Sequence, residues 1–310
     1  MIISASRRTD IPAFYSDWFT NRLREGFVLV RNPMNIHQVS RISLNPAVVD
    51  CIVFWTKNPS HMLEKLPFYS RYNYYFQFTI TPYNRRLEPN VIEKQGVISV
   101  FQKLSKYLGK NRLIWRYDPI ILTEDITVEN HVAWFTQLTE SLSGFTSKCV
   151  ISFLDLYKKS EKNLLGIKLV SLTPAKIVEL TQKIVSIANS RDIEIVTCAE
   201  EIDLSRLGIK HGHCIDDKLV SEIAGLPVSL SKDKTQRAEC GCVASIDIGA
   251  YNTCPHGCLY CYANFDANAV KQNYSYHRTE SPLLLGKIEE NDRITDRKMI
   301  SCFDMQQKLL

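Results

Sequence analysis

The sequence alternates short apolar segments, rich in β-branched and aromatic residues, with longer segments whose apolar residues recur every three or four positions. The first pattern predicts buried strands and the second predicts amphipathic helices. Such alternation favours a largely parallel sheet, because two parallel neighbours need a crossover connection, usually a helix. The candidate strands are residues 1–5, 51–55, 74–81, 112–117, 149–154, 193–198 and 243–248.

The helical spacing predicts helices over residues 97–108, 128–142 and 177–188. Another helix is expected between Asp10, a good N-cap, and Gly26, a good terminating residue. Residues 27–44 carry β-favouring side chains on both sides of a turn and predict a β-hairpin beside a barrel. The predicted fold class is therefore α/β, a barrel-like (β/α) fold with an added hairpin.

The 310 residues, 45% of them hydrophobic, exclude a disordered chain and a small disulfide-stapled protein. Length alone would suggest two domains, but (β/α) barrels use about 200 to 250 residues as one unit. We expect one integrated domain. Residues 1–239 would form the barrel body, and the cysteine-rich segment 240–310 would supply the last strand, a cluster loop and a C-terminal extension.

The formal net charge of +5 comes without a tract of basic residues. This composition permits an anionic ligand and does not support nucleic acid as a partner, although it does not exclude one. The first residues lack the features of a secretory signal, and no window approaches about 18 uninterrupted apolar residues. We therefore expect a cytoplasmic protein without a membrane partner.

Polar residues follow most of the candidate strands. In a barrel these positions lie at the carboxyl end, where functional groups gather, although each could equally be a solvated loop. Arg7 and Arg8 could hold a phosphate or carboxylate, or form solvated ion pairs. No catalytic residue can be singled out. The residues at these strand ends are Ser6, Arg7, Arg8, Thr9, Asp10, Trp55, Thr56, Lys57, Asn58, Thr79, Thr81, Arg116, Asp118, Asp155, Glu200 and Glu201.

Seven of the ten cysteines are crowded into one part of the chain, and Cys51, Cys149 and Cys302 lie apart from them. In a reducing compartment, clustered thiols are more often metal ligands or catalysts than disulfides. Cys51 and Cys149 are expected to pack in the core. The crowded residues are Cys198, Cys214, Cys240, Cys242, Cys254, Cys258 and Cys261.

Cys254, Cys258 and Cys261 form a CxxxCxxC motif. Three thiolates at this spacing can surround one face of a metal centre, and a four-iron cluster held by them would keep one iron open. Zinc is the alternative, with Cys240 or Cys242 as a fourth ligand. His256, inside the motif, is expected to pack against the loop and not to bind the metal.

The other four crowded cysteines, Cys198, Cys214, Cys240 and Cys242, could form a second metal site. Four thiolates suit either an auxiliary iron-sulfur cluster or a structural zinc ion. The alternative is that Cys198 ends a core strand and behaves as a small hydrophobic residue.

The CxxxCxxC loop, with the aromatic Tyr260 before its third cysteine, resembles the radical S-adenosylmethionine superfamily. The resemblance implies a [4Fe-4S] cluster on Cys254, Cys258 and Cys261, with S-adenosylmethionine chelating the fourth iron and Tyr260 on its adenine side. Reductive cleavage would yield methionine and a 5′-deoxyadenosyl radical. A low-potential donor such as a flavodoxin or ferredoxin would supply the electron, and the substrate is unknown. Residues 258–263 look most like the cluster loops of spore photoproduct lyases.

Nearly the whole chain also resembles an uncharacterised bacterial family, domain of unknown function 1848. The strings that carry this resemblance are residues 3–10, 54–58, 115–119 and 240–263. In the superfamily the cysteine loop usually follows the first barrel strand, whereas here it lies near the C-terminus. A circularly permuted radical S-adenosylmethionine partial barrel, with residues 243–248 beside residues 1–5, would reconcile the two. No Gly-Gly-Glu string for the cofactor's amino group is present.

The leading hypothesis is a radical S-adenosylmethionine enzyme. A zinc-stabilised barrel that binds nucleic acid or protein is one alternative, and an iron-sulfur protein for electron transfer or redox sensing is another. Metal and sulfide content separates the zinc protein from the other two, and consumption of S-adenosylmethionine separates those two from each other.

Overall fold

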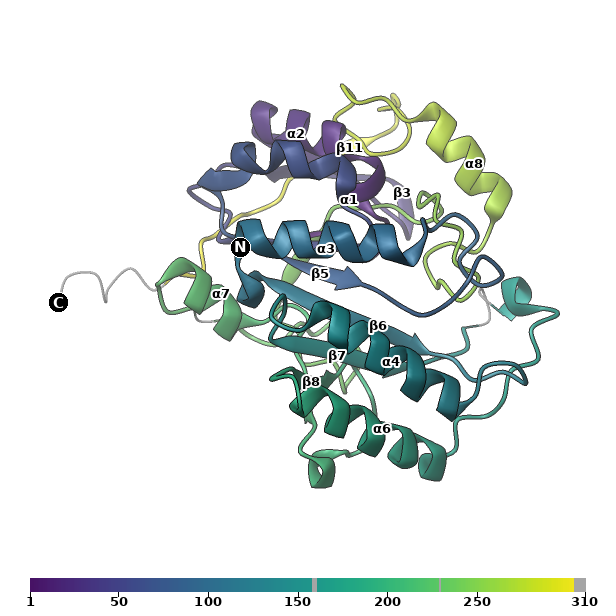
Figure 1. Ribbon diagram of the computed structural model, residues 1–310. Helices are drawn as coiled ribbons and strands as arrows, with labels where there is room; N and C mark the ends of the chain where they lie inside the picture. Colours follow the sequence, from purple (N-terminus) through teal and green to yellow (C-terminus); the bar gives the residue numbers. More distant parts are fainter. Residues whose placement is uncertain (158–160, 229, 304–310) are drawn as a thin grey trace.

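The computed structural model describes residues 1–157, 161–228 and 230–303, and its central element is a parallel sheet of eight strands (Figure 1). Every neighbouring pair in this sheet is parallel. The chain is therefore mixed α/β, as the alternation predicts. In spatial order the strands are β10 (Ser245–Asp247), β1 (Ile2–Ala5), β4 (Cys51–Thr56), β5 (Tyr74–Thr79), β6 (Leu113–Ile120), β7 (Lys148–Phe153), β8 (Glu194–Thr197) and β9 (Lys210–His211).

Helices α3, α4 and α6 lie across one face of the sheet (Figure 1). The predicted cap is present, since the Asp10 side chain accepts from Ala13 N, and Thr173, followed by a proline, caps α6. The helix expected from Asp10 to Gly26 is divided at Tyr15.

No helix in the described ranges has the length and apolar character needed to span a bilayer. The α-helices are α1 (Ile11–Phe14), α2 (Ser16–Glu25), α3 (Lys94–Leu108), α4 (Val128–Leu142), α6 (Pro174–Asn189), α7 (Asp217–Ala224) and α8 (Ala267–Tyr276). The 3₁₀ helices in the described part of the chain are η1 (Ser60–Arg71), η2 (Lys110–Arg112), η3 (Lys162–Leu164) and η4 (Ser205–Leu207).

Both faces of the sheet are apolar over much of their length. Side chains alternate along a strand, so Ile52 packs with the helices while Val53 points to the other face. On that second face the strands pack against Cys214, Ile215 and Val243 and other residues of the long connection from β9 to β10. This connection therefore covers the face that α3, α4 and α6 leave free.

All seven predicted strands are present, with ends shifted by a few residues. The expected adjacency of residues 243–248 and 1–5 is confirmed, because β10 pairs in parallel with β1 and Ile2 lies opposite Ser245. In the described ranges β10 and β9 are the two edges of the sheet, so a closed or partial barrel stays a prediction. The expected segments 1–239 and 240–310 include residues 158–160, 229 and 304–310, which lie outside the described residues.

The predicted hairpin is formed by β2 (Phe27–Asn32) and β3 (Asn35–Ser43), which pair antiparallel. A third strand, β11 (Arg293–Asp296), adds in parallel to β3. The sequence pattern does not predict β11, because all four of its residues are exposed and lack apolar alternation.

Candidate functional site

The carboxyl ends of the parallel strands open into a cavity of about 530 Å³. Residues that follow six of the strands line it, as expected for a sheet whose strands all point the same way. Of the polar residues predicted at strand ends, Asn58, Thr81, Glu200 and Glu201 are not in the lining. Those in the lining are Ser6, Arg7, Arg8, Thr9, Asp10, Trp55, Thr56, Lys57, Thr79, Arg116, Asp118 and Asp155.

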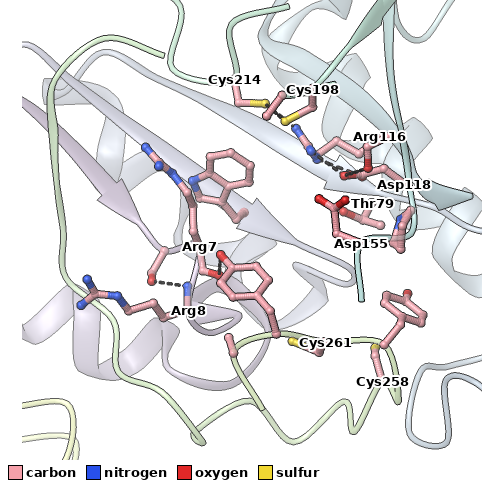
Figure 2. A pocket seen from close by; sticks show the side chains of 18 of the residues that line it. Arg7, Arg8, Thr79, Arg116, Asp118, Asp155, Cys198, Cys214, Cys258 and Cys261 are labelled. Atoms are coloured by element: carbon pink, nitrogen blue, oxygen red, sulfur yellow. Dashed lines mark hydrogen bonds and ion pairs between the residues drawn. The ribbon is translucent and has the colours of Figure 1, made fainter. Parts of the chain in front are cut away.

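All seven crowded cysteines line this one cavity. Figure 2 shows Cys258 and Cys261 on one side of it and Cys198 and Cys214 on the opposite side. The scattered Cys51 and Cys149 are fully buried in the core, as predicted. The structure thus divides the crowded cysteines into two groups that face a shared space.

Backbone hydrogen bonds hold the loop that carries Cys254, Cys258 and Cys261. At its base Asn252 N donates to Ala263 O over 2.9 Å. Leu259 N donates to Leu87 O over 3.0 Å, which ties the loop to the segment after β5. Gly257 has φ +69°, a conformation that favours glycine. These contacts hold the loop in one conformation, which lowers the entropic cost of binding a metal there.

His256 packs within the loop, in agreement with the sequence expectation. It is 4% exposed, and its Nε2 lies 2.9 Å from Asp10 Oδ2. The same carboxylate oxygen accepts from Lys57 N over 2.7 Å, and Asp10 also caps α1. Asp10 therefore connects the loop to the ends of β1 and β4.

A buried carboxylate, Glu88, supports the loop from the other side. It is 1% exposed and accepts from Lys57 Nζ over 2.7 Å, from Lys94 Nζ over 2.6 Å and from the Tyr260 hydroxyl. Burial by itself would raise the pKa of Glu88, but the two ammonium groups outweigh it and lower the pKa to about 2. Sequence reasoning missed Glu88, because it lies in irregular structure with no periodicity or motif to mark it.

Burial raises the pKa of all three loop thiols above the usual value for cysteine. Burial raises the pKa of Cys258 to about 12, although Lys57 opposes the shift. Burial also raises the pKa of Cys254, and Asp10 adds to the increase. A bound metal would take the place of the thiol protons and stabilise the thiolates by its positive charge. Three thiols on one fixed loop, facing a cavity, form a donor set that fits an iron-sulfur cluster with an open iron.

In the second group of thiols, two of the sulfur atoms have close contacts that hold them in position. Cys198 Sγ and Cys214 Sγ lie 3.2 Å apart, and Arg116 Nη1 donates to Cys214 Sγ over 2.8 Å. In the described ranges no three of the cysteine sulfurs lie within 4.8 Å of one another. Within the described residues, the group that does meet this distance is the exposed His213 with the half-buried Asp216 and Asp217.

Charged side chains of both signs form the wall between the two groups of thiols (Figure 2). The guanidinium of Arg116 pairs with both carboxylate oxygens of Asp118. Two arginines lie close to the ring of Trp55, with Arg7 Cζ 5.6 Å and Arg116 Cζ 5.1 Å from its centroid. Both Arg7 and Arg8 line the cavity, and Arg8 Nε lies 4.0 Å from Asp247 Oδ1, as the ion-pair alternative predicts. The wall can therefore bind a polar molecule with complementary charges.

Comparison with known proteins gives a family for the chain. No curated protein and no solved structure matches it. The family model described as "Domain of unknown function (DUF1848)" matches residues 2–263, which is most of the sequence. That match includes both groups of thiols and the charged wall between them. The chain therefore belongs to the DUF1848 family.

Proposed function

We propose that this protein is a radical S-adenosylmethionine enzyme. Cys254, Cys258 and Cys261 would hold a [4Fe-4S] cluster, and the cavity would hold S-adenosylmethionine and the substrate. The observation that carries the proposal is the position of the CxxxCxxC loop, whose three cysteines all line a cavity at the carboxyl ends of a parallel sheet. A metal there would meet a substrate bound in the same space.

The strand order supports the permuted form of a partial (β/α) barrel. The loop begins a few residues after β10, which is the neighbour of β1 in the sheet. In space, therefore, the loop follows an edge strand that stands before β1, although in sequence it comes late. Chain ends that lie close together make such a reordering possible in related folds.

The cluster and S-adenosylmethionine, when bound, would supply a one-electron reductive cleavage that generates a carbon-centred radical. The chain itself would position the loop and enclose the reaction. Glu88 and its two lysines hold Tyr260, whose ring lies on the proposed adenine side, while Asp10 holds His256. The buried strand ends form the cavity wall and would keep water away from a reactive intermediate.

The cavity limits the substrate in size and polarity. Its volume of about 530 Å³ lies in the range typical of small-molecule pockets. Arg7, Arg116 and Arg237 line it together with Asp118 and Asp155. These features support a polar substrate of moderate size. The electron would come from a low-potential protein such as a flavodoxin or ferredoxin.

The test uses anaerobically purified protein with its iron and sulfide content measured. Reduction with dithionite in the presence of S-adenosylmethionine should produce 5′-deoxyadenosine, and Cys258→Ala should abolish it. The matched control is Cys302→Ala, a half-buried cysteine outside the cavity lining, which should leave the product yield unchanged. The proposal fails if Cys258→Ala retains full cleavage, or if the loop binds zinc and the protein contains no sulfide.

A further inference from the structure

Four cysteines outside the CxxxCxxC loop line the same cavity, and Figure 2 shows two of them, Cys198 and Cys214, on the side opposite the loop. They come from three separate parts of the chain. Cys198 follows β8 directly, Cys214 follows β9, and Cys240 and Cys242 precede β10. Cys214, Cys240 and Cys242 are at most 8% exposed, and all ten cysteines in the chain are free thiols. Convergence from distant segments is more specific than four cysteines in one loop, because the fold has to bring them together.

Backbone hydrogen bonds place each segment against the sheet. Cys198 N donates to Ile151 O on β7 over 3.0 Å. The Cys214 carbonyl accepts from the Tyr75 hydroxyl over 2.8 Å and from Gln77 Nε2 over 2.9 Å, so it is anchored to β5. Val243 N donates to Ile215 O over 3.1 Å, which joins the two cysteine segments to each other. The positions of the sulfurs are therefore set by the strands.

Hydrogen-bond donors point at two of these sulfurs. Arg116 Nη1 lies 2.8 Å from Cys214 Sγ, and Ile215 N lies 3.4 Å from Cys242 Sγ. Neither donor can accept a hydrogen bond, so each sulfur acts as the acceptor. A thiolate accepts more strongly than a thiol, and a charged donor such as Arg116 stabilises it further. These contacts are suited to metal-bound thiolates, whose remaining lone pairs need partners.

Close packing of two glycines brings the cysteine segments together. A Cβ at Gly212 would lie 2.6 Å from Val196 Cγ2 and 2.9 Å from Thr197 O on β8. A Cβ at Gly241 would lie 2.3 Å from His213 Cδ2. Residues 212–214 therefore lie tight against β8, and the Cys240-Gly241-Cys242 turn lies tight against residues 212–214. Larger residues at either position would separate the sulfurs.

We infer that Cys198, Cys214, Cys240 and Cys242 form a tetrathiolate metal centre, separate from the CxxxCxxC site and facing the same cavity. Four thiolates are the ligand set of both zinc and iron-sulfur centres. The inference goes beyond the proposed function and does not depend on it. A metal would hold the β9-to-β10 connection on the second face of the sheet and form part of the cavity wall.

The test separates the two groups of thiols by substitution. One variant replaces Cys254, Cys258 and Cys261 with serine, and a second replaces Cys214 and Cys242 with serine. Iron, zinc and acid-labile sulfide are measured per chain after anaerobic purification. The loop variant should keep the metal held by Cys198, Cys214, Cys240 and Cys242, and the second variant should lose that metal. Zinc without sulfide in the loop variant identifies a zinc site, and iron with sulfide identifies a cluster; either supports the inference.

Thiol labelling covers the case in which the second variant does not fold, because it leaves the four cysteines intact. In the loop variant, a thiol-alkylating reagent and peptide mass spectrometry would follow each cysteine before and after treatment with a chelator. Cys198 and Cys240 should react about tenfold faster or more once the metal is removed. Cys302, outside the group, is the control and should not change. A metal-free loop variant whose labelling rates are the same with and without chelator overturns the inference, whatever the outcome for S-adenosylmethionine cleavage.

Discussion

Ser4 on β1 donates a hydrogen bond to Asp247 on β10 over 2.9 Å and so links two strands from opposite ends of the chain. The same carboxylate accepts from Ser6 Oγ over 2.6 Å, Arg7 N over 2.8 Å and Gly249 N over 3.0 Å. Asp247 therefore holds together the end of β1 and the start of the segment that leads to the cysteine loop. The three-residue strand β10 has few ladder hydrogen bonds of its own, so this side chain contributes much of its anchoring.

Replacing Asp247 with alanine should lower the free energy of unfolding by about 2–4 kcal/mol, because four donors in a half-buried site lose their acceptor. Urea unfolding would measure the change. The control is Asp296→Ala on β11, whose side chain is 82% exposed and lies 3.7 Å from Arg41. That substitution should change stability by less than about 0.5 kcal/mol. Equal effects of the two substitutions would contradict the role of Asp247.

Glu88→Gln should destabilise the protein by about 2–4 kcal/mol, because it leaves the half-buried ammonium groups of Lys57 and Lys94 without a compensating charge. Glutamine keeps the shape of the side chain, so the effect reports the charge. Denaturant unfolding is the measurement. Glu93→Gln is the matched control, since the carboxylate of Glu93 is 81% exposed and pairs with Arg85 at the surface. If Glu88→Gln were as mild as this control, the buried network would not support the loop.

Buried His131 should make the stability of the protein fall at acid pH. Burial lowers the pKa of His131 to about 4, from about 6.5 in the unfolded chain. The unfolded state therefore binds more protons between these values, so stability is lost as the pH falls from about 6.5 towards 4. The loss from this group should be on the order of 3 kcal/mol at the acid limit.

His131→Gln should remove most of that pH dependence. An amide can accept from the Tyr117 hydroxyl and donate to Ile121 O, the two partners of His131, without taking up a proton. Thermal or urea unfolding at pH 4.5, 5.5 and 7 would compare the variant with the wild type. The control is His61→Gln, at an exposed position, which should leave the pH dependence of stability unchanged. A wild-type slope that persists in His131→Gln would assign the dependence to other groups.

The two glycines of the cysteine segments should respond differently to alanine. Gly212→Ala clashes with Thr197 O, a backbone atom that cannot move away, and should cost about 1–3 kcal/mol. Gly241→Ala clashes with the His213 ring, so the added substitution His213→Ala should restore stability. Unfolding curves of the two single variants and of each combined with His213→Ala provide the test. Rescue of Gly212→Ala by His213→Ala, or failure to rescue Gly241→Ala, would contradict the packing described above.

The helices and strands could be predicted because the signals for them are local. Thr173 and Pro174 mark the start of α6, and residues 149–154 have the apolar run of a buried strand. β9 and β11 could not be predicted, because β9 has only two residues and β11 is entirely exposed. Short or exposed strands carry no periodic burial, so only their pairing partners define them.

The residues of the candidate site also fall into those that the sequence predicts and those that it does not. The spacing of Cys254, Cys258 and Cys261 and the aromatic Tyr260 are visible in one short string of sequence. Glu88, which supports that string, carries no signal, because its role comes from Lys57 and Lys94 on other segments. The contact of Arg116 with Cys214 joins residues 98 positions apart and could not be predicted from either one.

The sequence by itself therefore determined the α/β class, seven strands of the parallel sheet, the hairpin and the CxxxCxxC loop, since each depends on residues close together in the chain. Only the tertiary structure decided that Glu88 lies against the cysteine loop, and that both groups of cysteines face one cavity. Strand order brings distant segments together, and it results from the packing of whole strands and helices against one another. No local pattern of residues encodes that packing, so the shared cavity could be recognised only in the folded chain.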